Sequence, residues 1–337
     1  MTLARKLLDS AATTIFVATL ALSAAQAHAA DKVSIMVGGY DKQIYLPAKL
    51  AEALGYFKDE GLDVELLNEA AGVDAENEML AGAVQGVVGF YDHCIDLQAK
   101  GKFVESVVQF SQAPGEVELV SSKHPEIKSP ADFKGMSLGV TGLGSSTNFL
   151  TQYLAVKNGV KLGEFTSVPV GAGATFIAAM QQDKIQAGMT TEPTITRLLK
   201  TGEAKILIDM RTVEGTKAAL GGTYPAASLY MQTDWVEAHK DTVQKLANAF
   251  VKTLQFINTH SGAEIADKMP KDYYVGDKEG YVKALDDGKA MFTADGVMPE
   301  GGPETVLTVL SAFSKDLKGK QVDLSKTYTT EFVKNAK

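Results

Sequence analysis

The chain has 337 residues and a formal net charge of -8, with 45% hydrophobic and 22% charged residues. This composition is typical of a folded globular protein of about two domains and argues against a disordered chain. An acidic chain without a stripe of lysine and arginine also argues against nucleic acid and anionic lipid as partners.

Residues 1–29 have the pattern of a secretory signal peptide. Arg5 and Lys6 form a basic start, residues 11–22 are mostly apolar, and small residues between 25 and 29 offer a cleavage site. The apolar run is well short of the roughly 20 residues that a membrane-spanning helix needs. We therefore expect a soluble mature protein that is exported to the periplasm.

The chain has one cysteine, Cys94, and five histidines that are dispersed along it. A single thiol cannot form an intramolecular disulfide, and Cys94 lies too far from the cleavage site to carry a lipid anchor. Because no group of histidines and cysteines has the spacing of metal ligands, we expect neither a metal nor a cofactor.

Strand and helix patterns alternate in two stretches of the chain, which implies parallel strands joined by crossover helices. The first stretch predicts strands at 33–37, 62–66 and 87–90 and helices at 47–55 and 76–83. The second predicts strands at 137–140, 167–170, 185–189 and 205–208 and helices at 147–157 and 175–182. Between them, the predicted strands 104–110 and 116–121 are joined through Ala113-Pro114-Gly115, where we expect the chain to cross between lobes.

The last third of the chain is predicted to be helical. Apolar residues recur every three or four positions from Val243 to Ile257, and another helix is expected to begin at Pro303. We predict an α/β protein in which residues 30–112 form the first part of lobe 1 and residues 113–220 form lobe 2. Residues 221–337 are predicted to return to lobe 1 and to add the C-terminal helices.

Ligands of open parallel sheets bind beyond the carboxyl ends of the strands. The strongest candidate loop there is Gly142 to Asn148, because glycines end a strand and Ser145, Ser146, Thr147 and Asn148 open a helix. A helix start attracts anions through its free N–H groups and its dipole. The alternative is that Ser145 or Ser146 only caps the helix.

Other strand ends supply further candidates. They are Gly39 and Tyr40, the run Tyr91-Asp92-His93, and the pair Thr191 and Glu192. Tyr224 is a further candidate, because it precedes Pro225 in a segment that suits a cleft wall or a hinge. A tyrosine offers a planar ligand both a ring face and a hydroxyl group. Each of these residues can equally have a structural role, and one histidine beside one aspartate is weak evidence for catalysis.

The chain resembles a known family over nearly all of residues 32–333. The segments that carry the resemblance are Leu54 to Leu62 (LGYFKDEGL), Asp132 to Gly135 (DFKG) with Gly144-Ser145, Gln186 to Gly188 with Glu192-Pro193, and Tyr328-Thr329 near Phe332. The chain is similar there to periplasmic solute-binding proteins of the nitrate, sulfonate and taurine type, which share their fold with thiamine-pyrimidine synthases.

The resemblance implies a two-lobed periplasmic-binding-protein fold of type II, with the ligand in the cleft between the lobes. It implies a monomer that closes on a small ligand by a hinge motion and delivers it to the membrane subunits of an ABC importer. Two alternatives remain: an exported sensor that serves a receptor, and an enzyme like the synthases. The synthases carry a cysteine-rich motif that this chain lacks, so we expect no enzyme activity.

After the signal peptide the chain has two arginines, Arg197 and Arg211. We expect an organic anion held by Ser145 to Asn148, with Tyr40, Tyr91 and His93 receiving the body of the ligand. The tyrosines slightly favour an aromatic carboxylate, while sulfonates and heterocycles such as pyrimidines remain open. An amino acid is less expected, because its carboxylate commonly pairs with an arginine.

Overall fold

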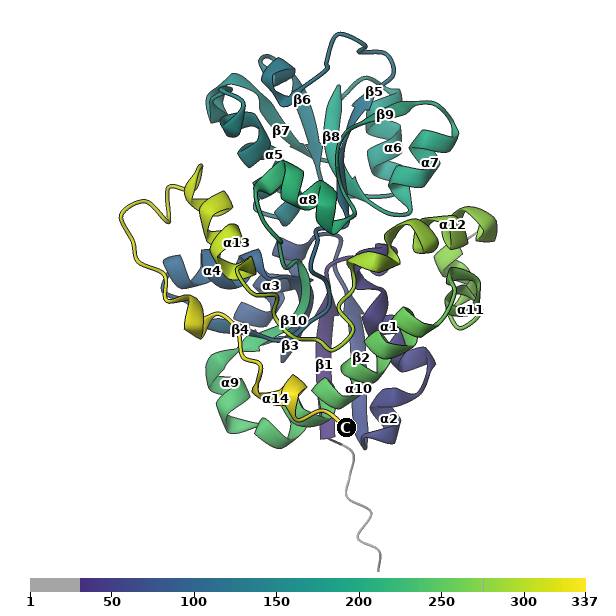
Figure 1. Cartoon of the computed structure of the whole chain (residues 1–337), viewed down its shortest axis with the longest axis vertical. Coiled ribbons are helices and arrows are strands. Elements are labelled where there is room, and N and C mark those ends of the chain that lie inside the picture. The colour runs from purple at the N-terminus through teal and green to yellow at the C-terminus, as the bar shows by residue number, and fades with distance from the viewer. Residues whose placement is uncertain (1–30, 275) are drawn as a thin grey trace, which may run out of the picture.

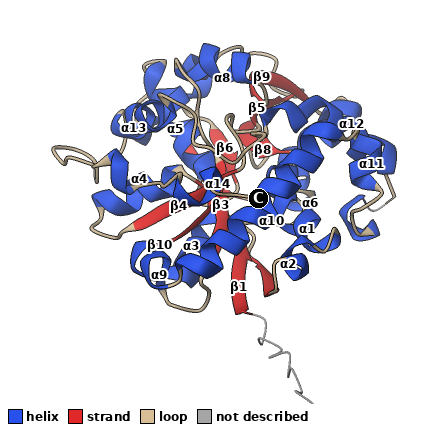
Figure 2. Cartoon of the chain, turned by 60° about the horizontal axis from the view of Figure 1, so that its bottom comes forward, coloured by secondary structure: helices blue, strands red, loops and turns tan. Residues whose placement is uncertain are grey.

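The computed structural model describes residues 31–274 and 276–337, which form two α/β lobes stacked one above the other (Figure 1). Each lobe is built on a five-stranded mixed sheet with helices packed around it, so that the strands lie inside (Figure 2). The predicted α/β two-lobed fold is therefore confirmed. The predicted signal peptide lies outside the described residues.

The sheet of lobe 1 has the strand order β2-β1-β3-β10-β4. Its strands are β1 (Asp31–Val37), β2 (Leu62–Asn68), β3 (Gly86–Phe90), β4 (Val104–Gln109) and β10 (Ala227–Gln232). β1 pairs in parallel with β2 and with β3, as the sequence predicts. β10 was not predicted, and it lies antiparallel between β3 and β4.

The sheet of lobe 2 has the strand order β7-β6-β8-β5-β9. Its strands are β5 (Glu116–Ser121), β6 (Ser137–Val140), β7 (Thr166–Pro169), β8 (Ala187–Thr191) and β9 (Ala204–Met210). β6 pairs in parallel with β7 and β8, whereas β5 runs antiparallel to β8 and β9. Each sheet thus contains one strand that runs against its parallel core.

Ten of the described helices belong to lobe 1 or follow it. They are α1 (Leu46–Ala53), α2 (Tyr56–Asp59), α3 (Gly72–Leu80), α4 (Asp92–Ala99), α9 (Thr233–Ala238), α10 (Lys240–Thr259), α11 (Gly262–Ala266), α12 (Lys278–Gly288), α13 (Gly302–Ser311) and α14 (Glu331–Lys334). The predicted apolar stripe of α10 is fully buried, from Val243 to Ile257. α3 begins four residues before the predicted helix, directly after the loop that follows β2.

Lobe 2 carries α5 (Ser146–Lys157), α6 (Ala174–Gln181), α7 (Thr194–Lys200) and α8 (Val213–Leu220). Short 3-10 turns complete the described secondary structure: η1 (Gln43–Tyr45), η2 (Pro130–Phe133), η3 (Leu162–Glu164), η4 (Lys271–Tyr274), η5 (Lys289–Met291) and η6 (Leu324–Lys326). None of the helices within the described residues is both long and apolar enough to span a bilayer.

Two neighbouring segments connect the lobes. The first leaves β4 and enters β5 through Ala113-Pro114-Gly115, which confirms the predicted crossing, and the second runs from α8 to β10. The two segments bond to each other: Phe110 N donates to Ala227 O at 2.8 Å, and Ala227 N donates to Ser111 Oγ at 2.9 Å. A paired connection of this kind lets two bodies rotate about one axis. The predicted lobe boundaries at 112/113 and 220/221 stay predictions.

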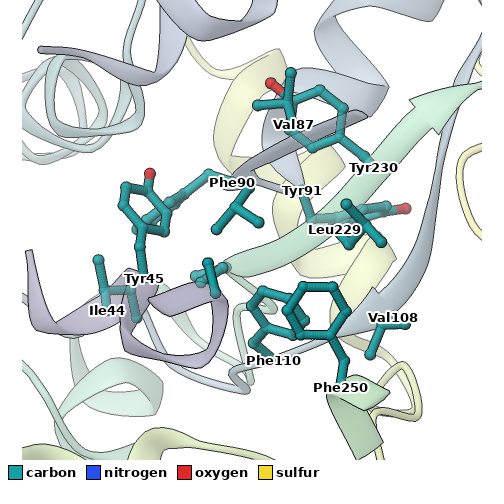
Figure 3. Packing of buried hydrophobic residues seen from close by; sticks show 14 of the residues in the cluster. Ile44, Tyr45, Val87, Phe90, Tyr91, Val108, Phe110, Leu229, Tyr230 and Phe250 are labelled. Atoms are coloured by element: carbon teal, nitrogen blue, oxygen red, sulfur yellow. The ribbon is translucent and has the colours of Figure 1, made fainter. Parts of the chain in front are cut away.

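The largest apolar cluster fills lobe 1 and extends across to lobe 2. In lobe 1, Phe90, Tyr91 and Phe110 pack with Tyr230 and Phe250 in its interior (Figure 3). Phe149 and Leu150 of α5 belong to the same cluster, as do Met189 of β8 and Met210 at the end of β9. Apolar side chains of the two lobes are therefore in contact, and the lobes are closed.

Candidate ligand-binding site

Strand ends from both sheets meet where the lobes face each other. Because β5 is antiparallel to β8, Glu116 at the start of β5 pairs with Thr191 at the end of β8. In the same way Ala227 at the start of β10 pairs with Phe90 at the end of β3. The interlobe surface thus combines the carboxyl ends of the parallel strands with the amino ends of β5 and β10, and both of those strands follow a crossing segment.

Direct bonds hold the two lobes in this closed arrangement. The backbone of Gln43 donates to the carbonyl of Glu192 at 3.1 Å, and Val73 N donates to Ser145 Oγ at 3.4 Å. At the rim, Lys200 Nζ lies 3.2 Å from Asp277 Oδ2. The loop after β1 and the start of α3 therefore contact the strand ends of lobe 2.

Two buried carboxyl groups lie at this interface, one from each lobe. Asp92 begins α4, and its Oδ2 accepts a hydrogen bond of 2.9 Å from the hydroxyl of Tyr224 on the second crossing segment. Glu116 begins β5, and its Oε1 accepts a hydrogen bond of 3.3 Å from Ser146 Oγ at the start of α5. Their side chains are 0% and 1% exposed.

Each of these hydrogen bonds uses only one of the two oxygens of its carboxyl group. Within residues 31–274 and 276–337, Asp92 Oδ1 and Glu116 Oε2 have no hydrogen-bond partner, and neither does the hydroxyl of Thr191 opposite Glu116. Leaving a buried polar atom unpaired costs about 1–3 kcal/mol. The closed lobes thus gather hydrogen-bonding groups that a ligand can satisfy.

Burial changes the acidity of both carboxyls. It raises the pKa of Asp92 to about 6, although the neighbouring His93 and the Tyr224 hydroxyl oppose the shift. It also raises the pKa of Glu116 well above the ordinary value, and the charge of Asp92 adds to this increase while Lys42 opposes it. The two groups influence each other because both lie in the same desolvated region.

Lys42 ties the first two strand-end loops of lobe 1 together. Its ammonium donates to the carbonyl of Gly38 at 2.5 Å and to that of Ala70 at 3.0 Å. Burial lowers the pKa of Lys42 to about 8, against the opposing charges of Asp41 and Glu116. Gly39 makes room for it: its φ is +123°, and a Cβ there would lie 2.6 Å from the Lys42 side chain.

His93 and Glu76 form a buried ion pair behind this surface. His93 Nδ1 lies 2.7 Å from Glu76 Oε2, and the ring centroid is 5.9 Å from that of Phe149 in lobe 2. Burial lowers the pKa of His93, but the charge of Glu76 outweighs it, with help from Asp92 and Asp96, and raises that pKa to about 9. The imidazole is therefore protonated at neutral pH and paired with Glu76.

Residues 45–262 match the sequence profile of the family described as NMT1/THI5 like, a match that spans more than half of the chain. The chain belongs to this family. A solved protein of Bordetella bronchiseptica RB50 is 38% identical over 90% of this chain and 96% of its own, with a TM-score of 0.87.

More distant proteins with the same fold include two binding proteins. The alkanesulfonate-binding protein SsuA from Xanthomonas axonopodis pv. citri, solved with MOPS, is 16% identical with a TM-score of 0.71, covering 89% of this chain and 98% of its own. The periplasmic nitrate-binding protein NrtA from Synechocystis PCC 6803 is 14% identical with a TM-score of 0.70, covering 90% and 87%. At these identities the likeness shows the fold alone.

A curated relative has the name of an enzyme. The 4-amino-5-hydroxymethyl-2-methylpyrimidine phosphate synthase THI11 of Saccharomyces cerevisiae is 26% identical over 163 residues, which are 48% of this chain and 46% of the yeast protein. The chain thus matches about half the length of that relative.

The helix start predicted to bind an anion lies at the interlobe surface of this NMT1/THI5-like protein. Ser145 precedes α5 without capping it, and Ser146 bonds to Glu116, so the simple capping role is not observed. The Thr147 hydroxyl accepts a 3.0 Å hydrogen bond from Thr141 N. Asn148 Oδ1 accepts one of 3.0 Å from Gly144 N, so these two side chains shape the loop itself.

Two predicted tyrosines have other partners. Tyr91 is a core residue whose hydroxyl bonds to Thr327 and whose ring packs edge-on against Tyr328, so it is turned into lobe 1 (Figure 3). Tyr40 is half-buried, with its ring 5.9 Å from the ammonium of Lys49 on α1. The expectation that Tyr91 receives the ligand is corrected accordingly, because helix α4 begins at the next residue and fixes its direction.

The side chain of Glu192 also has partners within lobe 2. Its Oε1 lies 3.0 Å from the guanidinium of Arg211, and its Oε2 accepts a 3.0 Å hydrogen bond from Thr196 N. Arg211 also bonds to Asp209, so this arginine is occupied within lobe 2. Glu192 therefore acts on the interface through its backbone carbonyl.

The sequence interpretation missed Glu116, Lys42 and Glu76. Glu116 was overlooked because only the carboxyl ends of predicted strands were searched, whereas an antiparallel strand brings its amino end to the same edge. A usable signal was present: glutamates alternate with apolar residues in the run Glu116-Val117-Glu118-Leu119-Val120, directly after the crossing segment. In the described part of the chain, no group of three or more histidines, cysteines and carboxylates is arranged to hold a metal.

Proposed function

We propose that this protein is the periplasmic substrate-binding component of an ABC importer and captures a small organic ligand by hinge closure. The observation that carries the proposal is the set of buried, unpaired polar atoms contributed by both lobes, at Asp92, Glu116 and Thr191. The solved binding proteins that share the fold support it. Export through a cleaved signal peptide belongs to the same proposal.

The mechanism is binding without chemistry. The open form admits the ligand, and closure then buries Asp92 and Glu116 between the lobes. Closing over an empty cleft leaves their oxygens unpaired, which penalises that form by about 1–3 kcal/mol for each group. A ligand that supplies hydrogen bonds removes the penalty, and this difference in affinity shifts the population to the closed form, which docks on the importer.

The predicted ligand class is a small organic anion, with an aromatic carboxylate slightly favoured. The start of α5 supports this part of the proposal, because no side chain caps it and the first N–H groups of a helix have no partner within the helix. The hydroxyl of Ser145 lies at this helix start and already bonds across the lobes.

We propose binding and not catalysis as the function, despite the partial match to a synthase. His93, whose ring lies against Phe149 of the other lobe, is paired with Glu76. Cys94 is fully buried in the core of lobe 1, and burial raises the pKa of its thiol well above the ordinary value. A thiol in that environment is a poor nucleophile.

The proposal is tested by a thermal-shift panel on protein without residues 1–29, combined with small-angle scattering. The panel contains aromatic carboxylates, alkyl sulfonates, nitrate, pyrimidines and amines. A ligand at 100 times its dissociation constant adds about 2.7 kcal/mol of stability, which is readily seen. We expect a shift with one chemical class and a smaller radius of gyration with the same compound. A panel that produces neither change would remove the binding-protein assignment.

A further inference from the structure

The two carboxyl groups at the interface favour a different ligand group from the anion that the start of α5 favours. Asp92 comes from lobe 1 and Glu116 from lobe 2, and each is held by one hydroxyl, from Tyr224 and Ser146 respectively. Each also keeps one oxygen without a partner in the described parts of the chain, 31–274 and 276–337. Both free oxygens are hydrogen-bond acceptors when the carboxyl groups are ionised.

Within residues 31–274 and 276–337, no cationic side chain bonds to these two oxygens. His93 opposes the pKa increase of Asp92, but it is paired with Glu76. The charge of Lys42 opposes the pKa increase of Glu116, so Lys42 is a candidate partner for that carboxyl group. Its ammonium, however, bonds to the carbonyls of Gly38 and Ala70. Among the described residues, no ion pair joins Lys42 to either carboxyl group. Arg211 of lobe 2 is occupied by Asp209 and Glu192.

A ligand anion at the start of α5 would compete with a carboxyl group of the protein for the same hydrogen-bond donor. Ser146, one of the residues predicted to hold a ligand anion, donates its hydroxyl to Glu116 Oε1. A second anion in this desolvated region would raise the pKa of both carboxyl groups further, whereas a hydrogen-bond donor stabilises their ionised form, which burial disfavours. The part of the ligand that faces these groups must therefore donate hydrogen bonds.

We propose that the ligand carries an amino-type N–H donor group, which binds between Asp92 and Glu116 in the closed protein. Primary amines, amidines and amino-substituted heteroaromatic rings have this chemistry, because each presents two or more N–H bonds to two acceptors. An acidic group can occupy another part of the same ligand, away from the two carboxyls. This inference rests on the proposed function and specifies the ligand of the same site.

The position of the two acceptors also explains how such a group drives closure. Asp92 is fixed in lobe 1 and Glu116 is the first residue of a strand in lobe 2. One amino group that bonds to both carboxyls bridges the lobes. A ligand without the donor can reach the open cleft, but it gains nothing from these two acceptors on closure.

The test compares probes that differ by one amino group. The pairs are benzoate with 4-aminobenzoate, ethanesulfonate with taurine, and pyrimidine with 4-aminopyrimidine, measured by calorimetry and by small-angle scattering on protein without residues 1–29. We expect the amino member of at least one pair to bind at least tenfold more tightly than its partner and to close the lobes.

Three variants assign the effect to the two carboxyls. Asp92→Asn and Glu116→Gln should each reduce the preference for the amino member at least tenfold. Glu118→Gln is the matched control, because Glu118 lies two residues further along β5, is equally buried and accepts a hydrogen bond of 2.8 Å from Thr151. This variant should keep the preference of the wild type.

Two results would overturn the inference, and they are distinguishable. If compounds without an amino group bind as tightly and close the lobes, and Asp92→Asn and Glu116→Gln leave this unchanged, the inference fails and the proposed function stands. If no probe in this set or in the wider panel binds or closes the protein, both fail.

Discussion

His93 and Glu76 form a buried ion pair beneath the surface where the lobes meet. The pKa of His93 is about 9 in the folded protein, against about 6.5 for an unperturbed histidine. The folded protein thus binds the proton more tightly than the unfolded chain does. The stability that the pair contributes is fully present below pH 6.5 and is lost as the pH rises through 9.

This linkage predicts a pH-dependent difference in the free energy of unfolding. We expect the wild type to lose about 3 kcal/mol relative to the double variant His93→Gln with Glu76→Gln between pH 6.5 and 9. Urea unfolding of both proteins at several pH values measures the difference. Using the double variant avoids leaving Glu76 buried without its partner. A gap that does not change with pH would show that His93 is neutral in the folded state.

At the residue level, the sequence predicted which segments lie at the interlobe surface better than it predicted the contacts of their individual side chains. It selected Tyr91-Asp92-His93 as a group, but α4 begins at Asp92, and successive residues of a helix point about 100° apart. The three side chains therefore reach different places: the core, the interface and the Glu76 pair. Local sequence does not show which of three adjacent residues faces a cleft.

The start of α5 is the element on which the anion hypothesis depends. Replacing Ser145 and Ser146 together by alanine removes the bond to Val73 across the lobes and the bond to Glu116. We expect ligand affinity to fall at least tenfold, while the stability of the unliganded protein changes by no more than about 1–2 kcal/mol. Calorimetry with a compound that binds in the panel and urea unfolding measure the two effects.

The matched control for this variant lies at another helix start of lobe 2. Ser129 precedes η2 and bonds to Asp132, far from the interlobe surface. Ser129→Ala removes the same kind of hydroxyl and should leave ligand affinity unchanged. Equal affinity in the wild type and in the Ser145/Ser146 double variant would remove these serines from the site.

At the element level, most strands and helices were predictable, but the direction of two strands was not. Hydrophobic runs identified β4 and β5, and the glycine and proline between them marked the crossing correctly. β10 was missed, and nothing in the apolar pattern of β5 showed that it runs antiparallel. An apolar pattern indicates that a strand is buried, whereas the neighbours of the strand and its direction depend on the rest of the sheet.

A charged pair at the rim of the cleft joins the two lobes and contributes to closure. Lys200 at the end of α7 pairs with Asp277, the residue that precedes α12. Lys200→Glu places two negative charges together in the closed form, and we expect it to weaken ligand binding by roughly two- to fivefold. Because both side chains are partly exposed, salt should reduce the effect.

Lys205→Glu is the control for this prediction, since it makes the same charge change on an exposed residue of β9 in the same lobe. Calorimetry at low and at high ionic strength compares the two variants. If both weaken binding to the same extent, the loss reflects the net charge of lobe 2 and not a contact made on closure.

The chain order of the strands also determines when each lobe can be completed. The strands of the lobe 2 sheet are contiguous, from Glu116 to Met210, so this sheet is complete before β10 has been made. The lobe 1 sheet, by contrast, has β10 in fourth place, between β3 and β4. Until residues 227–232 arrive, that sheet exists as two unconnected pieces. A nascent chain can thus assemble its second lobe first, and it acquires a ligand-binding cleft only when β10 joins the two pieces of the first.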